Sequence, residues 1–210
     1  MSVICGKIHV LSSSQEIYSF VSNPKNIPQN GIYVLFEEGE LAHDTNRIVR
    51  VGTHTGKDQL RSRLDQHFIH ENKDRSIFRK NIGRALLNRD HDPFSDQWEL
   101  DLTTHAAKLK YIGIIDLVKQ LQVERRVTEY IQQCFKFVVF EVATKEDRLK
   151  WESHLISTIS LCEECKPSSQ WLGQYSPKEK IRKGGLWIVN ELYKQPLSER
   201  ELEQMCHQWG

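Results

Sequence analysis

The sequence predicts an α+β fold in which helices flank a small, mainly antiparallel sheet of three strands. Three stretches rich in β-branched and aromatic residues support this prediction, at residues 31–36, 47–51 and 135–142. Helical patterns lie between the second and third stretches and after the third. Because strands and helices do not alternate regularly along the chain, a doubly wound parallel sheet is not expected.

The first 30 residues are predicted to form an N-terminal extension. A short helix is expected at residues 13–20, where serines can accept hydrogen bonds from its first N–H groups. Pro24 and Pro28 then interrupt any regular element, because proline lacks an N–H and restricts the backbone.

The first two strands are predicted to form a hairpin, with turn-forming residues at 37–46 between them. A helix that ends at Phe68 follows, and a capping-box pattern from Thr55 to Asp58 predicts where it begins. Leu60, Leu64 and Phe68 are spaced four residues apart, so they are expected to form its buried stripe.

A helical insertion is predicted at about residues 70–130. Its helices are expected at residues 77–87, 114–121 and 124–131, with a break at Asp92-Pro93 between the first and the second. This insertion and the three strands belong to a predicted core at residues 31–160.

The third strand leads into a helix at residues 144–159, which begins at a second capping pattern. Residues 161–210 are rich in glycine and proline near their start. They are therefore expected to form a loop-rich C-terminal extension that packs on the core and ends in a helix at residues 198–207.

The composition is that of an ordinary globular protein. The 210 residues carry a formal net charge of +1 and are 39% hydrophobic, which suits one domain with insertions. No apolar run approaches the ~20 residues of a membrane-spanning helix, and no secretory signal is expected. Five scattered cysteines argue against a disulfide framework and favour a cytoplasmic location.

Local charge is more informative about partners than net charge. Basic residues outnumber acidic ones at residues 73–89. Since basic side chains on phosphates add affinity through counterion release, four of these residues are candidates for DNA contacts: Arg75, Arg79, Lys80 and Arg84. A solvated helix face explains the same pattern equally well.

Glu152 is expected on the inward face of its helix. Leu149, Leu155 and Ile156 lie three or four residues away from it, and these positions share one helical face. Burial of an ionised carboxylate without a partner costs several kcal/mol. Glu152 therefore needs a metal ion, an arginine or a shared proton, unless it lies at the boundary and reaches water.

Arg63 and His67 are four residues apart on the helix that follows the hairpin. An arginine there can neutralise charge on a phosphate, and a histidine can orient water or move a proton. Tyr33 lies on the first strand, where packing is the commonest role of a tyrosine. All three residue types are compatible with phosphodiester hydrolysis.

Four segments, in this order, resemble the GIY-YIG nuclease family. Gly31-Ile32-Tyr33 matches the first motif, and Val51-Gly52 matches the end of the second. Residues 60–67 match the family helix, in which an arginine is followed by a histidine four residues later. Residues 151–158 match the helix that carries the metal-binding glutamate. Together these segments span residues 31–160.

The resemblance implies a metal-dependent endonuclease, of the restriction type, that hydrolyses DNA by in-line attack of water. Tyr33 would activate the water directly or through a relay, Arg63 would stabilise the phosphate, and His67 would support the attacking group. Glu152 would hold one divalent cation, Mg²⁺ or Mn²⁺. Duplex DNA is the expected substrate, and cutting both strands would favour a homodimer.

The chain departs from the family pattern in the second motif, where Arg50 stands in place of a tyrosine. A guanidinium can bind phosphate and stabilise a phenolate, but it cannot relay a proton as a phenol can. The late Asn or Gln of the family has no clear match. Gln170 is the best candidate, and Asn190 is the second.

Two other interpretations stay open. Because of Arg50, the chain could be a module that kept the fold and binds nucleic acid without cleaving it. Cys162 and Cys165 are separated by two residues, which suggests a zinc or thiol site. One such pair supplies only two ligands, so free cysteines at a helix end are the simpler expectation.

Overall fold

A computed structural model describes residues 2–20 and 26–210. Its sheet contains β1 (Gly31–Ala42), β2 (Thr45–Gly52) and β3 (Phe135–Glu141), in the order β2-β1-β3. Both neighbouring pairs are antiparallel. The predicted α+β class with a small antiparallel sheet is therefore confirmed.

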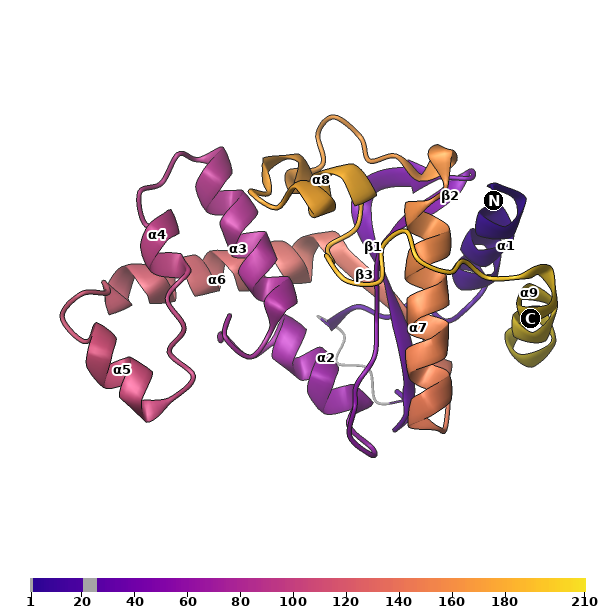
Figure 1. The fold of residues 1–210 in the computed structure, drawn as a ribbon, viewed down its shortest axis with the longest axis horizontal. Coiled ribbons are helices and arrows are strands. Elements are labelled where there is room, and N and C mark those ends of the chain that lie inside the picture. Colours follow the sequence, from indigo (N-terminus) through magenta and orange to yellow (C-terminus); the bar gives the residue numbers. More distant parts are fainter. Residues whose placement is uncertain (1, 21–25) are drawn as a thin grey trace.

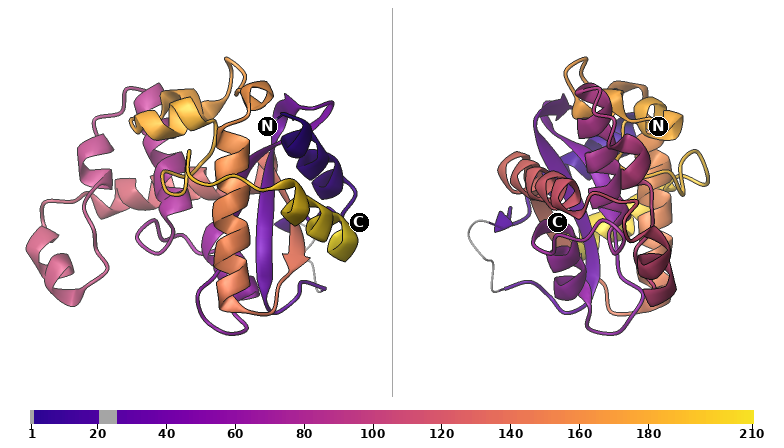
Figure 2. Two further views of the ribbon diagram at one scale, coloured as in Figure 1. Left: turned by 45° about the vertical axis from the view of Figure 1, so that its right-hand side comes forward. Right: turned by 90° about the vertical axis from the view of Figure 1, so that its left-hand side faces the viewer.

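Helices cover both faces of this sheet (Figures 1 and 2). Side chains alternate along β1, so Tyr33 and Leu35 point to one apolar cluster, whereas Ile32 and Val34 point to another. The first cluster includes side chains from α2 (Leu60–Phe68), α3 (Ile77–Arg89) and α6 (Leu117–Cys134). The second includes side chains from α1 (Ser2–Ser13), α7 (Lys145–Ser160) and α9 (Glu199–Trp209).

The first helix lies earlier than predicted. Residues 2–13 are helical, whereas the helix expected at residues 13–20 is absent from its described part, and Tyr18 instead forms a β-bridge with Phe137. The reason is burial: Cys5, Ile8 and Leu11 form a helical stripe that packs on the sheet. Burial of this stripe stabilises a helix at residues 2–13 more than serine caps would stabilise one that begins near residue 13.

The hairpin strands are longer than predicted, because polar residues of β1 are buried in specific hydrogen bonds. Glu37 accepts hydrogen bonds from the indole N–H groups of Trp171 and Trp187, and Glu40 pairs with Arg47. The turn shrinks to His43 and Asp44, which both have positive φ. That conformation suits a two-residue hairpin turn.

Helix starts differ in part from their predicted caps. α2 begins at Leu60 after Gln59, and Gln59 makes no capping hydrogen bond through its side chain, so the cap expected at Thr55 is wrong. Thr144 does cap α7, since its side chain accepts a hydrogen bond from the Asp147 N–H. The two helices expected near residues 114–131 are the single helix α6.

The insertion adds two short helices, α4 (Ser95–Trp98) and α5 (His105–Tyr111), at the end of the molecule far from α1 (Figure 1). The C-terminal segment contains η2 (Glu163–Cys165), η3 (Leu172–Tyr175) and α8 (Glu179–Gly184) before α9. In the described part of the chain, no helix has the length and apolarity needed to cross a bilayer.

Candidate active site

Tyr33 lies at the centre of the sheet, opposite Gly52 of β2. Its hydroxyl oxygen is 2.7 Å from Nε2 of His67. A Cβ atom at residue 52 would lie 2.2 Å from the same hydroxyl oxygen, so the space for the phenol exists only because residue 52 is a glycine. Tyr33 itself is 0% exposed.

His67 connects this phenol to the start of α3. Its Nδ1 is 2.7 Å from Oγ of Ser76, the residue that caps α3. Burial lowers the pKa of His67 well below its ordinary value of 6.5, and the charges of Arg63 and Arg50 lower it further. The ring is therefore neutral near pH 7, with one nitrogen that donates and one that accepts.

Arg50 points to the same side of the sheet as Tyr33. Its Nη1 donates a hydrogen bond of 2.5 Å to the carbonyl of Trp187, and its guanidinium lies 5.1 Å above the ring of Phe78. Its Nε is buried and has no hydrogen-bond partner among the described residues. The substitution in the second motif therefore places a buried positive charge in the site.

Glu152 reaches this group of residues from α7. Its Oε1 accepts a hydrogen bond of 3.1 Å from the Thr53 N–H, immediately after β2. Burial raises the pKa of Glu152, whereas the charge of Arg50, the Thr53 hydrogen bond and the charge of Arg63 oppose that rise. A half-buried carboxylate of this kind fits a divalent cation that keeps most of its water ligands, as Mg²⁺ does.

Arg63 lies on the exposed side of the site. Its Nη1 donates to Oε1 of Gln66 at 2.9 Å and to the carbonyl of Arg75 at 3.2 Å. It lines a pocket of about 330 Å³ together with residues of α2 and of the loop after β2. Thr53 lies in the same pocket and also binds Glu152. The pocket therefore adjoins the carboxylate and offers a cation to a phosphate.

Sequence reasoning missed three contributors to this site: Thr53, His54 and Ser76. His54 is buried, its Nε2 accepts from the Gly31 N–H, and its Nδ1 lies 2.8 Å from the Gly56 carbonyl. Burial lowers the pKa of His54. The position of Thr53 and His54 directly after Gly52 was the available signal, since polar residues that follow a strand of the site often line it.

Gln170, predicted as the late amide of the family, is exposed on the loop before η3. Its backbone N–H donates to Ser168, and Ser168 in turn binds Glu40 rather than Glu152. The turn next to Asn190 lies closer to the site, because Glu191 accepts a hydrogen bond from Ser153 and its charge raises the pKa of Glu152.

The basic residues predicted to contact DNA are mostly engaged within the protein. Arg79 is 0% exposed and pairs with Glu124, with 2.7 Å between Nη2 and Oε2. The prediction that Arg79 contacts DNA is wrong for this conformation, because a buried ion pair is costly to open.

Lys80 and Arg84 are also largely covered. Their side chains are 13% and 9% exposed, and both lie within ion-pair distance of Glu99. Glu99 lies outside residues 73–89, so the excess of basic residues in that stretch does not take its negative charge into account. Arg75 is exposed, and its carbonyl accepts from Arg63, which places it beside the pocket. Of the four basic residues predicted to contact DNA, Arg75 is therefore the one whose side chain is exposed for such a contact.

A search of curated proteins and a search of solved structures each found no match to this chain. A comparison with family models matched the GIY-YIG domain over residues 9–208. The match covers most of the chain, and membership implies a nuclease with a nucleic acid as its substrate. The chain therefore belongs to the GIY-YIG domain family.

Proposed function

We propose that this protein is a metal-dependent endonuclease that hydrolyses DNA phosphodiester bonds by in-line attack of water. The observation that carries the proposal is the convergence of one phenol, one neutral imidazole, two guanidinium groups and one carboxylate from β1, β2, α2 and α7. Arg50 and Arg63 both influence the pKa of His67 and that of Glu152, so the four side chains share one electrostatic environment.

The phosphate of the substrate is proposed to bind in the pocket beside Arg63. A guanidinium at that position offsets the negative charge that develops on the phosphate oxygens. Glu152 would hold Mg²⁺ or Mn²⁺ at the edge of the same pocket. When bound, such an ion polarises the phosphate and stabilises the leaving oxygen.

Tyr33 and His67 are proposed to move the proton of the attacking water. In this proposal the phenol passes its proton to Nε2 of His67 across the 2.7 Å hydrogen bond, and the phenolate oxygen then takes the proton of the attacking water. The guanidinium of Arg50, on the same side of the sheet as Tyr33, would stabilise the phenolate that results. Because Tyr33 is fully covered in the free protein, DNA binding must open a path for water to its hydroxyl.

Duplex DNA is the proposed substrate, with Arg63 and Arg75 as its first contacts. Cutting both strands with one site per chain requires two chains or two successive events, and a homodimer would supply the second site. A cytoplasmic, reducing location is proposed from the odd number and scattered positions of the five cysteines in the sequence.

A binding module without activity is the second candidate. Two observations favour it: Arg50 replaces the second tyrosine, and the hydroxyl of Tyr33 is shielded from solvent. Such a module would bind DNA with a steep salt dependence and leave the strands intact in either metal.

A plasmid-nicking assay separates the two candidates. Supercoiled DNA is incubated with the protein in Mg²⁺, in Mn²⁺ or in EDTA, and Glu152→Gln is compared with the wild type. Glu146→Gln is the matched control, because Glu146 is exposed on the first turn of the same helix. Nicking that requires metal and Glu152 but not Glu146 supports the endonuclease. Binding without nicking in every metal supports the inactive module.

A further inference from the structure

Five sulfur- and imidazole-bearing side chains meet on the side of the sheet covered by α1 and α7, which is opposite to the side that Tyr33 faces. Cys5 and His9 come from α1 and His43 from the hairpin turn, whereas Cys162 directly precedes η2 and Cys165 ends it. Ligand atoms of four of them, Cys5, His9, His43 and Cys165, all lie within 4.8 Å of one another. From the sequence, only Cys162 and Cys165 were expected to lie together.

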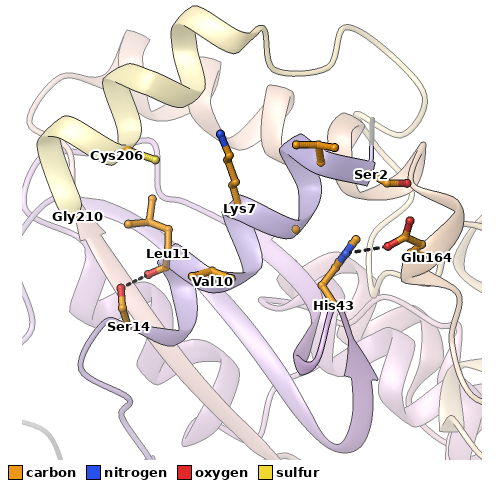
Figure 3. A pocket seen from close by; sticks show the side chains of 11 residues that line it. Ser2, Lys7, Val10, Leu11, Ser14, His43, Glu164, Cys206 and Gly210 are labelled. Carbon is orange, nitrogen blue, oxygen red and sulfur yellow. Dashed lines mark hydrogen bonds and ion pairs between the residues drawn. The ribbon is translucent and has the colours of Figure 1, made fainter.

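His43 occupies the centre of this group. Its Nε2 lies 3.4 Å from Sγ of Cys162 and 3.4 Å from Sγ of Cys165. Its Nδ1 lies 3.1 Å from Oε2 of Glu164, and Figure 3 shows this contact beside α1. A carboxylate on one ring nitrogen fixes the tautomer and leaves the other nitrogen free to bind a metal ion.

His9 has a different role, because each of its ring nitrogens makes a backbone hydrogen bond that is shorter than its contact with a sulfur, 3.7 Å from Nδ1 to Cys5 and 3.8 Å from Nε2 to Cys165. Nδ1 lies 2.9 Å from the carbonyl oxygen of Cys5, and Nε2 accepts a hydrogen bond of 3.2 Å from the Ile48 N–H. His9 therefore connects α1 to β2 and positions Cys5. Three thiols and one imidazole remain as donors.

We propose that Cys5, His43, Cys162 and Cys165 form a structural zinc site. Three cysteines and one histidine are one of the common ligand sets of tetrahedral structural zinc. With bonds of about 2.3 Å to sulfur and about 2.0 Å to nitrogen, neighbouring donors of such a site lie roughly 3.5–3.8 Å apart. The Cys5 and Cys165 sulfurs lie 3.3 Å apart, and Nε2 of His43 lies 3.4 Å from the Cys162 sulfur and from the Cys165 sulfur, so these three separations are within about 0.5 Å of such a site.

The site would tie together three segments that are distant in sequence. Cys5 lies in α1, His43 at the tip of the hairpin, and Cys165 in the segment that leads to Trp171 and Trp187. Since Trp187 holds Arg50 through its carbonyl, the zinc would stabilise the C-terminal segment that supports the nuclease site. The proposal itself stands whether or not the protein cleaves DNA.

Metal content of the purified full-length protein tests the site. We expect about one zinc per chain by elemental analysis, and we expect Co²⁺ to replace it with the absorption bands of a tetrahedral site that contains three thiolates. Cys165→Ser and Cys162→Ser should each lose the metal. Cys134→Ser and Cys206→Ser are matched controls outside the cluster and should keep it.

Two outcomes would overturn the proposal. One is a wild-type protein that holds neither zinc nor Co²⁺ under reducing conditions, or that carries a Cys5–Cys165 disulfide in place of a metal. The other is a Co²⁺ spectrum with two thiolates, together with metal loss in His9→Gln and metal retention in Cys162→Ser. If a variant fails to fold, the Co²⁺ absorption spectrum of the wild-type protein still tests the proposal, because it reports the number of thiolate ligands.

Discussion

The hydroxyl oxygen of Tyr33 and Nε2 of His67 lie 2.7 Å apart, in a space that Gly52 leaves open. The two residues come from the central strand and from the helix that carries Arg63. One hydrogen bond therefore joins the first motif to the motif of the arginine and histidine. Ser76 extends this connection to the start of α3.

Removal of the phenol hydroxyl should separate chemistry from binding. For Tyr33→Phe we expect the nicking rate to fall by roughly 10²–10⁴-fold, the range associated with general acid–base groups. Stability should fall by about 1–3 kcal/mol, because Nε2 of the buried His67 loses its partner. DNA affinity, measured by gel shift, should stay the same.

Tyr18→Phe is the control for this variant, since the hydroxyl of Tyr18 bonds the exposed Glu16 away from the site. Equal nicking rates for Tyr33→Phe and Tyr18→Phe would remove Tyr33 from the proposed mechanism.

Removal of the Arg50 charge should shift the pH dependence of nicking. Arg50 lowers the pKa of both His67 and Glu152, so Arg50→Met raises both pKa values. Activity needs His67 neutral and Glu152 ionised, so the acid limb of the pH–rate profile should move to higher pH. The rate at its optimum should fall about 10²–10³-fold, as for loss of a charge-stabilising donor.

Arg89→Met is a suitable comparison, because Arg89 makes an exposed ion pair with Asp90. The interpretation of Arg50 fails if its replacement leaves the acid limb in place or moves it to lower pH.

Arg79 and Arg75 should behave in opposite ways. Arg79→Met leaves Glu124 buried without its ion-pair partner, so we expect a loss of about 3–5 kcal/mol in the free energy of unfolding. Arg75→Ala should leave stability within about 0.5 kcal/mol and should reduce the salt slope of DNA binding by about one. Urea denaturation and gel shifts at several salt concentrations measure the two effects.

If Arg79→Met changes the salt slope of DNA binding and leaves the free energy of unfolding unchanged, the ion pair between Arg79 and Glu124 opens on DNA. That result would return Arg79 to the set of DNA contacts.

Burial of neutral histidines should make the fold sensitive to mild acid. The pKa of His67 is lower in the folded chain than its ordinary 6.5, mainly through burial, so the unfolded chain binds more protons below that pH. Its contribution is fully present above pH 6.5 and is lost as the pH falls below it. The expected slope is up to about 1.4 kcal/mol per pH unit.

Urea denaturation between pH 5 and pH 8 checks this prediction, and His67→Gln should reduce the slope. His54 adds to it with the same sign, because burial also lowers its pKa. A stability that is constant across this range would contradict the buried, neutral state of His67.

Most of the elements that build the site follow from local sequence patterns. Local periodicity predicts the three strands, α2 and the inward face of α7, because one face of each must be buried. The same periodicity predicts an inward position for Glu152, which is half-buried, whereas Leu149 on the same predicted face is exposed. The motif spacing then assigned Tyr33, Arg63 and His67 to one group.

Which charged groups are paired and which thiols lie together depends on contacts between distant segments. Arg79 and Glu124 lie 45 residues apart, and the exposure of a basic helix depends on such distant partners. Cys5, His43 and Cys165 likewise meet because α1 and the C-terminal segment both pack against the hairpin. Contacts between distant segments follow from how whole elements pack, and no local pattern encodes them.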